Sequence, residues 1–446
     1  RWNHLFSKKL FSNFTLLASN YDYLLDNKFE VGQSDKKTYS FEYDAFVKDF
    51  SLKMDFGYYL NESNTIRFGA QSIYHDFKVG EVDGQQDDVQ YSFKLPKIQG
   101  IENTAYVSNE QKVTKWFTLK YGLRYSLFQN IGKATVNVLD NNYNVVGEQK
   151  YSSGEVYNTY HGIEPRLAAN FILSDKHSIK TSYSRTRQYL LIASNSRTGN
   201  PLDVWIASSP NIEPQIADQY SAGYYRNFFN NKIETSLEVY YKDMQNQVAY
   251  KAFAEPQFNA DLEEELRFGK GEAYGTEFMI KKPEGKLSGW ISYSYSRSLR
   301  KINDIQEKGW FPSPYDRPHD LSIVAMYDLS RRISLSANWT YKTGRPVNAP
   351  AARYEYGNLI LPYYPGRNKD RTQDYHRLDL SLTLEGKSKP ENFFQGEWVF
   401  SIYNAYARKN TDALYFEQDG SNPYETNATR VSYFTIFPSV SYNFKF

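Results

Sequence analysis

The feature that most constrains the fold is a strict alternation of apolar and polar residues near the carboxyl end. In residues 434–446 (FTIFPSVSYNFKF), every second residue from Phe434 is apolar or aromatic, and most of the residues between them are polar. Successive strand residues face opposite sides of a sheet, so this strand has one apolar and one polar face. A soluble protein rarely leaves such a strand on an edge, because a bare apolar edge promotes aggregation. The segment predicts a wall strand with lipid on one side and a polar lumen on the other.

Composition excludes membrane-spanning helices and agrees with a large barrel. The 446 residues are 17% aromatic, with 40 Tyr, yet they contain no apolar run long enough for a spanning helix. Barrel strands instead alternate lipid-facing and polar residues. A mixture of soluble β domains is the competing interpretation. The prediction is one all-β domain, residues 1–446, that forms a transmembrane antiparallel β-barrel.

Charge and residue content disfavour several function classes. The net charge of +2, from 53 basic and 51 acidic residues, provides no field for nucleic acid. The absence of cysteine excludes disulfides and a thiolate nucleophile. No catalytic triad, nucleophile elbow or phosphate-binding glycine loop can be assembled, so the sequence predicts neither an enzyme nor a cofactor. The six histidines lack the spacing of metal ligands; they are His4, His75, His161, His177, His319 and His376.

Short turns and long loops alternate along the chain, which predicts about 17 strands. Turns such as residues 174–176 are expected in the periplasm, and loops such as residues 344–373 outside the cell. Residues 26–38 and the stretch after residue 77 are predicted as further loops, and residues 135–146 as a hairpin within a loop. A single-chain bacterial barrel has an even number of strands, and Arg1 lies within a strand, so further strands are expected before it.

The alternation is cleanest in residues 117–127. It predicts that Leu119, Tyr121 and Leu123 face lipid and that Lys120 and Arg124 face the lumen.

Seven segments in order carry a family resemblance. They are EPRLAANFILSDKHSIKTSYSRTRQYL, NIEPQIADQYSAGY, GEAYGTEFMIKKPEGKLSGWISYSYSRS, PSPYDRPHDLSIVAMYDLS, TGRPVNAPAARY, YHRLDLSL and FPSVSYNFKF. Together they resemble TonB-dependent outer-membrane receptors of the Bacteroidetes type. The resemblance implies a 22-stranded barrel around an amino-terminal plug with a TonB box. Neither the plug nor the box is in this sequence, so the chain is expected to be the carboxy-terminal barrel portion.

The resemblance also implies a function and partners. It implies TonB-dependent import of a scarce, bulky nutrient (a siderophore, haem, corrinoid, peptide or glycan) across the outer membrane of a Gram-negative bacterium. The implied partners are outer-membrane lipid, TonB acting through the plug, and an unidentified ligand, with a surface lipoprotein as a further candidate. A passive porin remains the alternative, because long loops and lumen charges of both signs permit a pore.

Aromatic and arginine residues in the long loops are the candidates for ligand contact. They combine rigid contact area with polar tips; they are Trp205, Trp310, Phe311, Arg345, Tyr354, Tyr356, Tyr363, Tyr364 and Arg367. An aromatic girdle and packing among the loops are the structural alternative for each residue. Phe446 has a separate predicted role, because terminal aromatic strands in the family resemble the signal read by the barrel-assembly machinery.

Three further motifs have mainly structural interpretations. The acidic stretch at Glu81, Asp83, Asp87 and Asp88 offers oxygen atoms to calcium but lacks the spacing of an EF-hand. Residues 261–265 (DLEEE) are predicted as a solvated or helical loop segment. In residues 315–318 (YDRP), the proline favours a turn or the start of a strand.

Overall fold

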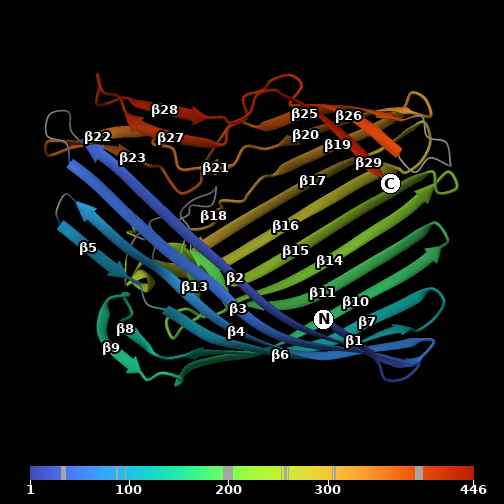
Figure 1. The fold of residues 1–446 in the computed structure, drawn as a ribbon, viewed down its shortest axis with the longest axis horizontal. Coiled ribbons are helices and arrows are strands. Elements are labelled where there is room, and N and C mark those ends of the chain that lie inside the picture. Colours follow the sequence, from blue (N-terminus) through green and yellow to red (C-terminus); the bar gives the residue numbers. More distant parts are fainter. Residues whose placement is uncertain are drawn as a thin grey trace.

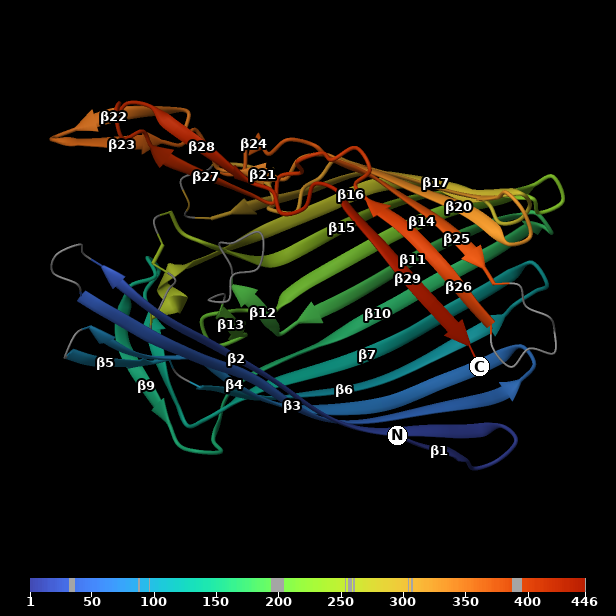
Figure 2. The same cartoon turned by 45° about the horizontal axis from the view of Figure 1, so that its top comes forward.

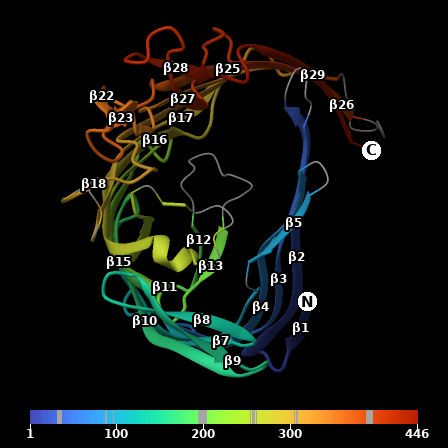
Figure 3. The ribbon, with the colours of Figure 1, turned by 90° about the vertical axis from the view of Figure 1, so that its left-hand side faces the viewer.

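One antiparallel sheet, seen from the side in Figure 1, curves into an almost complete ring (Figure 3). The computed structural model describes residues 1–31, 37–86, 89–95, 97–193, 204–252, 254–255, 259, 261–303, 305, 308–386 and 395–445. The wall strands are β1 (Trp2–Leu5), β2 (Leu10–Val31), β3 (Lys37–Asn61), β4 (Asn64–Gln86), β6 (Lys97–Lys112), β7 (Phe117–Ile131), β10 (Val156–Ser174), β11 (His177–Gln188), β14 (Gln215–Phe228), β15 (Ile233–Tyr250), β16 (Leu266–Lys282), β17 (Leu287–Ile302), β19 (His319–Asp328), β20 (Ile333–Lys342), β25 (Tyr375–Glu385), β26 (Gln395–Tyr403) and β29 (Phe437–Lys445).

Each wall strand pairs with the next one in the sequence. Within the described part of the chain the sheet has 19 strands, and two of these, β5 (Val89–Lys94) and β18 (Phe311–Pro312), are short additions to β4 and β17. The remaining strands agree with the predicted number of about 17, and the all-β antiparallel fold is confirmed. No ladder between described residues joins β1 to β29, so these two strands are the edges of the sheet. No described helix is long and apolar enough to cross a bilayer.

The other elements gather at one end of the wall, here called the loop end, and the short turns gather at the opposite turn end (Figure 1 and Figure 2). The loop elements are β8 (Ala134–Leu139), β9 (Val145–Tyr151), β12 (Leu190–Ala193), β13 (Val204–Ala207), the 3-10 helix η1 (Leu262–Glu265), β21 (Pro346–Val347), β22 (Ala352–Tyr356), β23 (Leu359–Tyr363), β24 (Asp370–Arg371), β27 (Ala413–Gln418) and β28 (Thr426–Val431). The hairpin predicted in residues 135–146 is confirmed as β8 and β9, and the helical reading of residues 261–265 as η1.

The two faces of the wall separate as predicted. On β7, Tyr121 and Leu123 lie opposite Leu167 and Pro165 of β10, and this row is exposed on the outer face. Arg124 points to the other face, where its guanidinium lies 3.3 Å from Glu102. That face is the interior, because Phe128 on the same side of β7 packs against the hairpin of β12 and β13 inside the ring (Figure 3).

Two predicted loops are instead continuations of strands. Residues 26–31 extend β2, and residues 37 and 38 begin β3, so that Val31 pairs with Lys37. Residues 78–86 likewise extend β4, which then pairs with β5. Above a membrane both faces of a strand meet water, so the apolar alternation ends although the ladder still pairs the backbone groups. The sequence rule therefore found the lipid-facing part of each strand and missed its extension.

The last two strands are shorter than predicted. β26 ends at Tyr403 instead of residue 408, because buried Asn404 adopts a left-handed conformation with φ of 53°. β29 begins at Phe437 instead of residue 434, and the Thr435 carbonyl accepts a hydrogen bond from the Asn404 side chain. Within β29 the predicted faces are correct: Tyr442 pairs with Trp398 on the apolar face, and the hydroxyl groups of Ser439 and Ser401 are 2.9 Å apart on the other.

Candidate ligand-binding site

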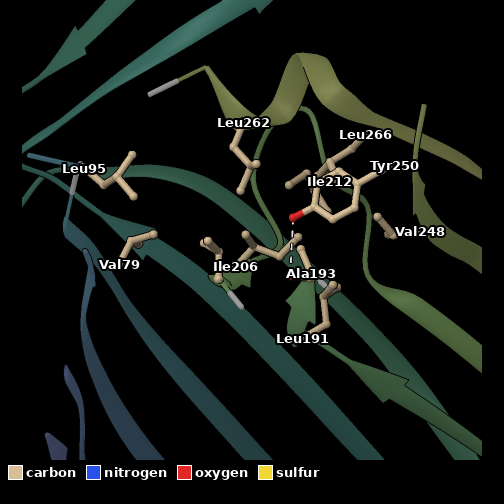
Figure 4. Close-up of a cluster of buried hydrophobic side chains, with 11 residues drawn as sticks. Val79, Leu95, Leu191, Ala193, Ile206, Ile212, Val248, Tyr250, Leu262 and Leu266 are labelled. Atoms are coloured by element: carbon tan, nitrogen blue, oxygen red, sulfur yellow. Dashed lines mark hydrogen bonds between the residues drawn. The ribbon is translucent and has the colours of Figure 1, made fainter. Parts of the chain in front are cut away.

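A hairpin of β12 and β13 folds into the ring at the loop end (Figure 3). Its apolar side chains join residues from β4, β15, η1 and β16 in one buried cluster. Ile212 and Leu266 are almost fully buried there, and the Tyr250 hydroxyl donates a hydrogen bond of 3.3 Å to the Ala193 carbonyl (Figure 4). This cluster anchors the hairpin inside the barrel and narrows the lumen at this end.

Trp205 belongs to this inward hairpin. It is half-buried in β13, and its ring lies 6.4 Å from that of Phe77 on β4. Trp205 therefore lies inside the lumen, apart from the other predicted contact residues, which belong to other loops.

A buried carboxylate ties the segment before β19 to a wall strand and to a second loop. The Asp316 side chain, fully buried, accepts hydrogen bonds from Arg297 Nε at 3.1 Å and from the Ser298 amide at 2.8 Å. Arg371 pairs with the same carboxylate and also donates to the Gly344 carbonyl at 3.0 Å. The structural interpretation of YDRP is correct, because Pro318 directly precedes β19. Asp316 joins this segment to β17 and to Arg371 before β25, and Arg371 in turn reaches Gly344 after β20. This set of contacts is called the Asp316 clamp below.

Two more of the predicted residues meet beside the clamp. Phe311 is buried in β18, and the Arg367 guanidinium lies over its ring at 5.9 Å. Arg367 also donates a hydrogen bond of 3.0 Å to the Tyr250 carbonyl, which links this loop to the wall. Trp310, the residue before Phe311, is largely exposed.

The predicted tyrosines share one face of a projecting hairpin. Tyr354 and Tyr356 of β22 lie on the same face as Tyr363 of β23, and all three are exposed. The opposite face bonds to the hairpin of β27 and β28, because Arg353 donates to Thr426 and Glu355 accepts from Tyr424. Tyr364 follows β23 and is also exposed.

Arg345 lies elsewhere, in a cavity of about 610 Å³ on the inner wall. The cavity lies where β20, β25 and β26 reach the loop end; it is lined by Arg317, Thr340, Lys342, Arg345, Tyr375, Arg377, Tyr403, Asn410, Thr411, Asp412, Tyr433 and Phe434. Phe434, predicted on the lipid-facing row, lies before β29 and lines this cavity instead. This group of residues is called the basic cavity below.

Sequence reasoning included Arg345 and missed the other basic residues of this cavity. Arg317, Lys342 and Arg377 were counted only as parts of wall strands, although the structure places Arg317 just before β19. Lys342 and Arg377 lie on the polar face where their strands meet long loops. This position is the signal that could have found them, since interior residues at a strand end meet the mouth of the barrel.

The remaining candidates have local partners. His319 accepts or donates a hydrogen bond of 2.8 Å with the Tyr293 hydroxyl, which agrees with the predicted rim role. Glu81 is paired with Lys78 at 2.7 Å, whereas Asp87 and Asp88 lie outside the described residues, as does Phe446. Among the described residues no cluster of His, Cys, Asp and Glu could hold a metal ion.

The fold and its two-faced wall define a transmembrane β-barrel. A family model described as TonB dependent receptor-like, beta-barrel, matches residues 1–405, so the chain belongs to this family of outer-membrane proteins of Gram-negative bacteria. No curated protein sequence matches the chain.

Solved receptors share the fold at low sequence identity. The ferric-catecholate import receptor Fiu of E. coli K12 is 12% identical with a TM-score of 0.59, and the match covers 99% of this chain and 63% of Fiu. The ferripyoverdine receptor of Pseudomonas aeruginosa is 13% identical with a TM-score of 0.62, and the match covers 99% and 55%. BauA, the ferric preacinetobactin receptor of Acinetobacter baumannii, is 13% identical with a TM-score of 0.58, and the match covers 99% and 61%. The chain thus spans 55% to 63% of the length of these receptors.

Proposed function

We propose that this barrel belongs to a receptor that imports a scarce, bulky nutrient across the outer membrane with energy supplied through TonB. The observation that carries the proposal is the family match over residues 1–405. TonB would act through a plug domain of the same polypeptide, as the family resemblance implies.

The loop end supports a receptor. It combines an inward hairpin, the Asp316 clamp and the basic cavity, so fixed side chains of several loops surround the mouth. A preorganised surface of this kind favours recognition of a particular ligand, because little side-chain freedom is lost on binding. The proposed ligand-contacting residues remain those predicted from the sequence, together with the lining of the basic cavity.

A ferric chelate is the first substrate class to test, because the three receptors compared above are named for ferric-catecholate, ferripyoverdine and ferric preacinetobactin. Haem, corrinoids, peptides and glycans follow, since the fold does not fix the ligand.

The test is uptake by whole cells that express the complete gene. Radiolabelled candidates are supplied to a strain with a working TonB system and to a matched strain without it. A receptor accumulates one candidate only when TonB is present. Uptake that is equal in both strains, and proportional to external concentration, would instead identify a passive channel.

A further inference from the structure

The basic cavity lies on the inner face of the wall. Thr340 pairs with Arg377 and Lys342 with Tyr375, whereas Trp339 pairs with Leu378 on the opposite face. The row that contains Trp339 continues through Ala337 and Leu335 beside Leu380 and Leu382, which is the apolar, lipid-facing side. The cavity therefore faces the lumen at the loop end, where a ligand enters, on the opposite side of the wall from lipid.

Two of its four basic side chains are already neutralised. Lys342 pairs with Asp320 at 2.8 Å, and Arg377 pairs with Asp379 at 2.9 Å. Arg377 also donates hydrogen bonds to the hydroxyl groups of Tyr375 and Tyr403 at 2.9 and 2.8 Å. These groups use their hydrogen-bonding capacity within the wall, and they hold the two tyrosines in place.

The other two cations have no such partner. Neither the Arg317 nor the Arg345 guanidinium has a hydrogen bond or ion pair with any residue that the structure describes, and Asp412 is the one acidic residue in the lining. Burial is the main cause that lowers the pKa of Arg317 from its ordinary value, and the charge of Arg345 lowers it further, whereas Asp320 and Tyr375 oppose the shift without cancelling it. Two like charges thus share a partly dehydrated space, and a bound anion would relieve both their repulsion and their lost solvation.

Both arginines are held by the loops around them. The Arg345 amide donates to the Thr372 hydroxyl at 2.9 Å, and the Thr372 amide donates back to the Arg345 carbonyl at 2.8 Å. Arg317 directly follows Asp316, the centre of the clamp. The two backbone positions are fixed before any ligand arrives, as a preorganised site requires.

We propose that Arg317 and Arg345 bind an oxyanion, a carboxylate or phosphate group of the imported ligand, with the cavity tyrosines packed beside it. Planar guanidinium groups match the paired oxygen atoms of these anions. A volume of about 610 Å³ lies within the range of small-molecule sites. This inference rests on the proposed function, because it treats the lumen-facing cavity as part of the import path.

The test is direct binding to the complete receptor in detergent, with inorganic phosphate and malonate as probes and glucose as a neutral control. Isothermal titration on the wild type is expected to detect both anions and not glucose. The double variant R317Q/R345Q is expected to bind them at least tenfold more weakly. R317K/R345K keeps the charge and loses the paired donors, so its affinity is expected to be intermediate. R353Q, which changes an arginine on β22 outside the cavity, is expected to bind as the wild type does.

Three results would overturn the proposal: no anion binding by the wild type, equal binding by R317Q/R345Q, or an equal loss in R353Q. Heat-modifiable mobility identifies any variant that is not folded. If R317Q/R345Q is not folded, the affinity of R317K/R345K relative to the wild type tests the proposal instead. The titration measures binding without transport. The anion-binding proposal and the proposed TonB-dependent uptake can therefore fail independently, and the two failures are told apart.

Discussion

Replacing Leu123 by Arg is expected to destabilise the barrel strongly. Leu123 lies on the outer face of β7 between Val107 and Pro165, and it is 46% exposed. It follows Phe117, the first residue of β7 at the turn end, by six positions. With a rise of about 3.4 Å per residue and a strand tilt of about 40°, this places it about 16 Å above the turn end, within a few ångströms of the middle of an apolar band about 25 Å tall.

An arginine at this depth is expected to cost about 2–4 kcal/mol. Urea unfolding of the complete receptor in phospholipid vesicles measures this cost, with heat-modifiable mobility as the readout of the folded fraction. Lys120→Arg is the matched control on the inner face of the same strand, where the added guanidinium meets water, and it is expected to leave the unfolding midpoint unchanged. If Lys120→Arg lowers the midpoint and Leu123→Arg does not, the two faces are assigned the wrong way round.

Three further predictions concern the loops and the chain end. The native chain has no cysteine, so a single introduced cysteine can be labelled without interference. Cysteine in place of Tyr356, which is 74% exposed, is expected to react with an impermeant maleimide on whole cells, whereas cysteine in place of Asp175 is not. The reverse labelling pattern would mean that the loop end faces the periplasm. Asp316→Asn removes the negative charge that Arg297 and Arg371 share. The expected local cost is about 2–3 kcal/mol, less than for a fully buried ion pair, because both guanidinium groups keep some exposure to solvent. Trypsin is therefore expected to cut these loops faster on intact cells, and an unchanged rate of cleavage would contradict the clamp. Deleting Phe446 is expected to reduce the heat-modifiable protein in outer-membrane fractions, and equal yields would remove its predicted role in assembly.

The sequence alone was enough for the wall. A strand between lipid and water must alternate with a period of two, and the period is a local property that each segment carries by itself. Residues 117–127 therefore showed which side chains face lipid before any partner strand was known. The same local rule failed where strands rise beyond lipid, as in the extensions of β2 and β4, because no apolar row is required there.

Only the tertiary structure decided how the mouth of the barrel is built. Arg345 was among the predicted contact residues, but its neighbours Arg317 and Arg377 come from other segments of the chain, and nothing in the local pattern joins them. They meet because the register of β20 and β25 places their ends together and because Asp316 pairs with Arg297 of β17 and with Arg371 of a later loop. Such contacts depend on residues distant in sequence, so the alternation that specifies the wall carries no information about which loop side chains share a cavity.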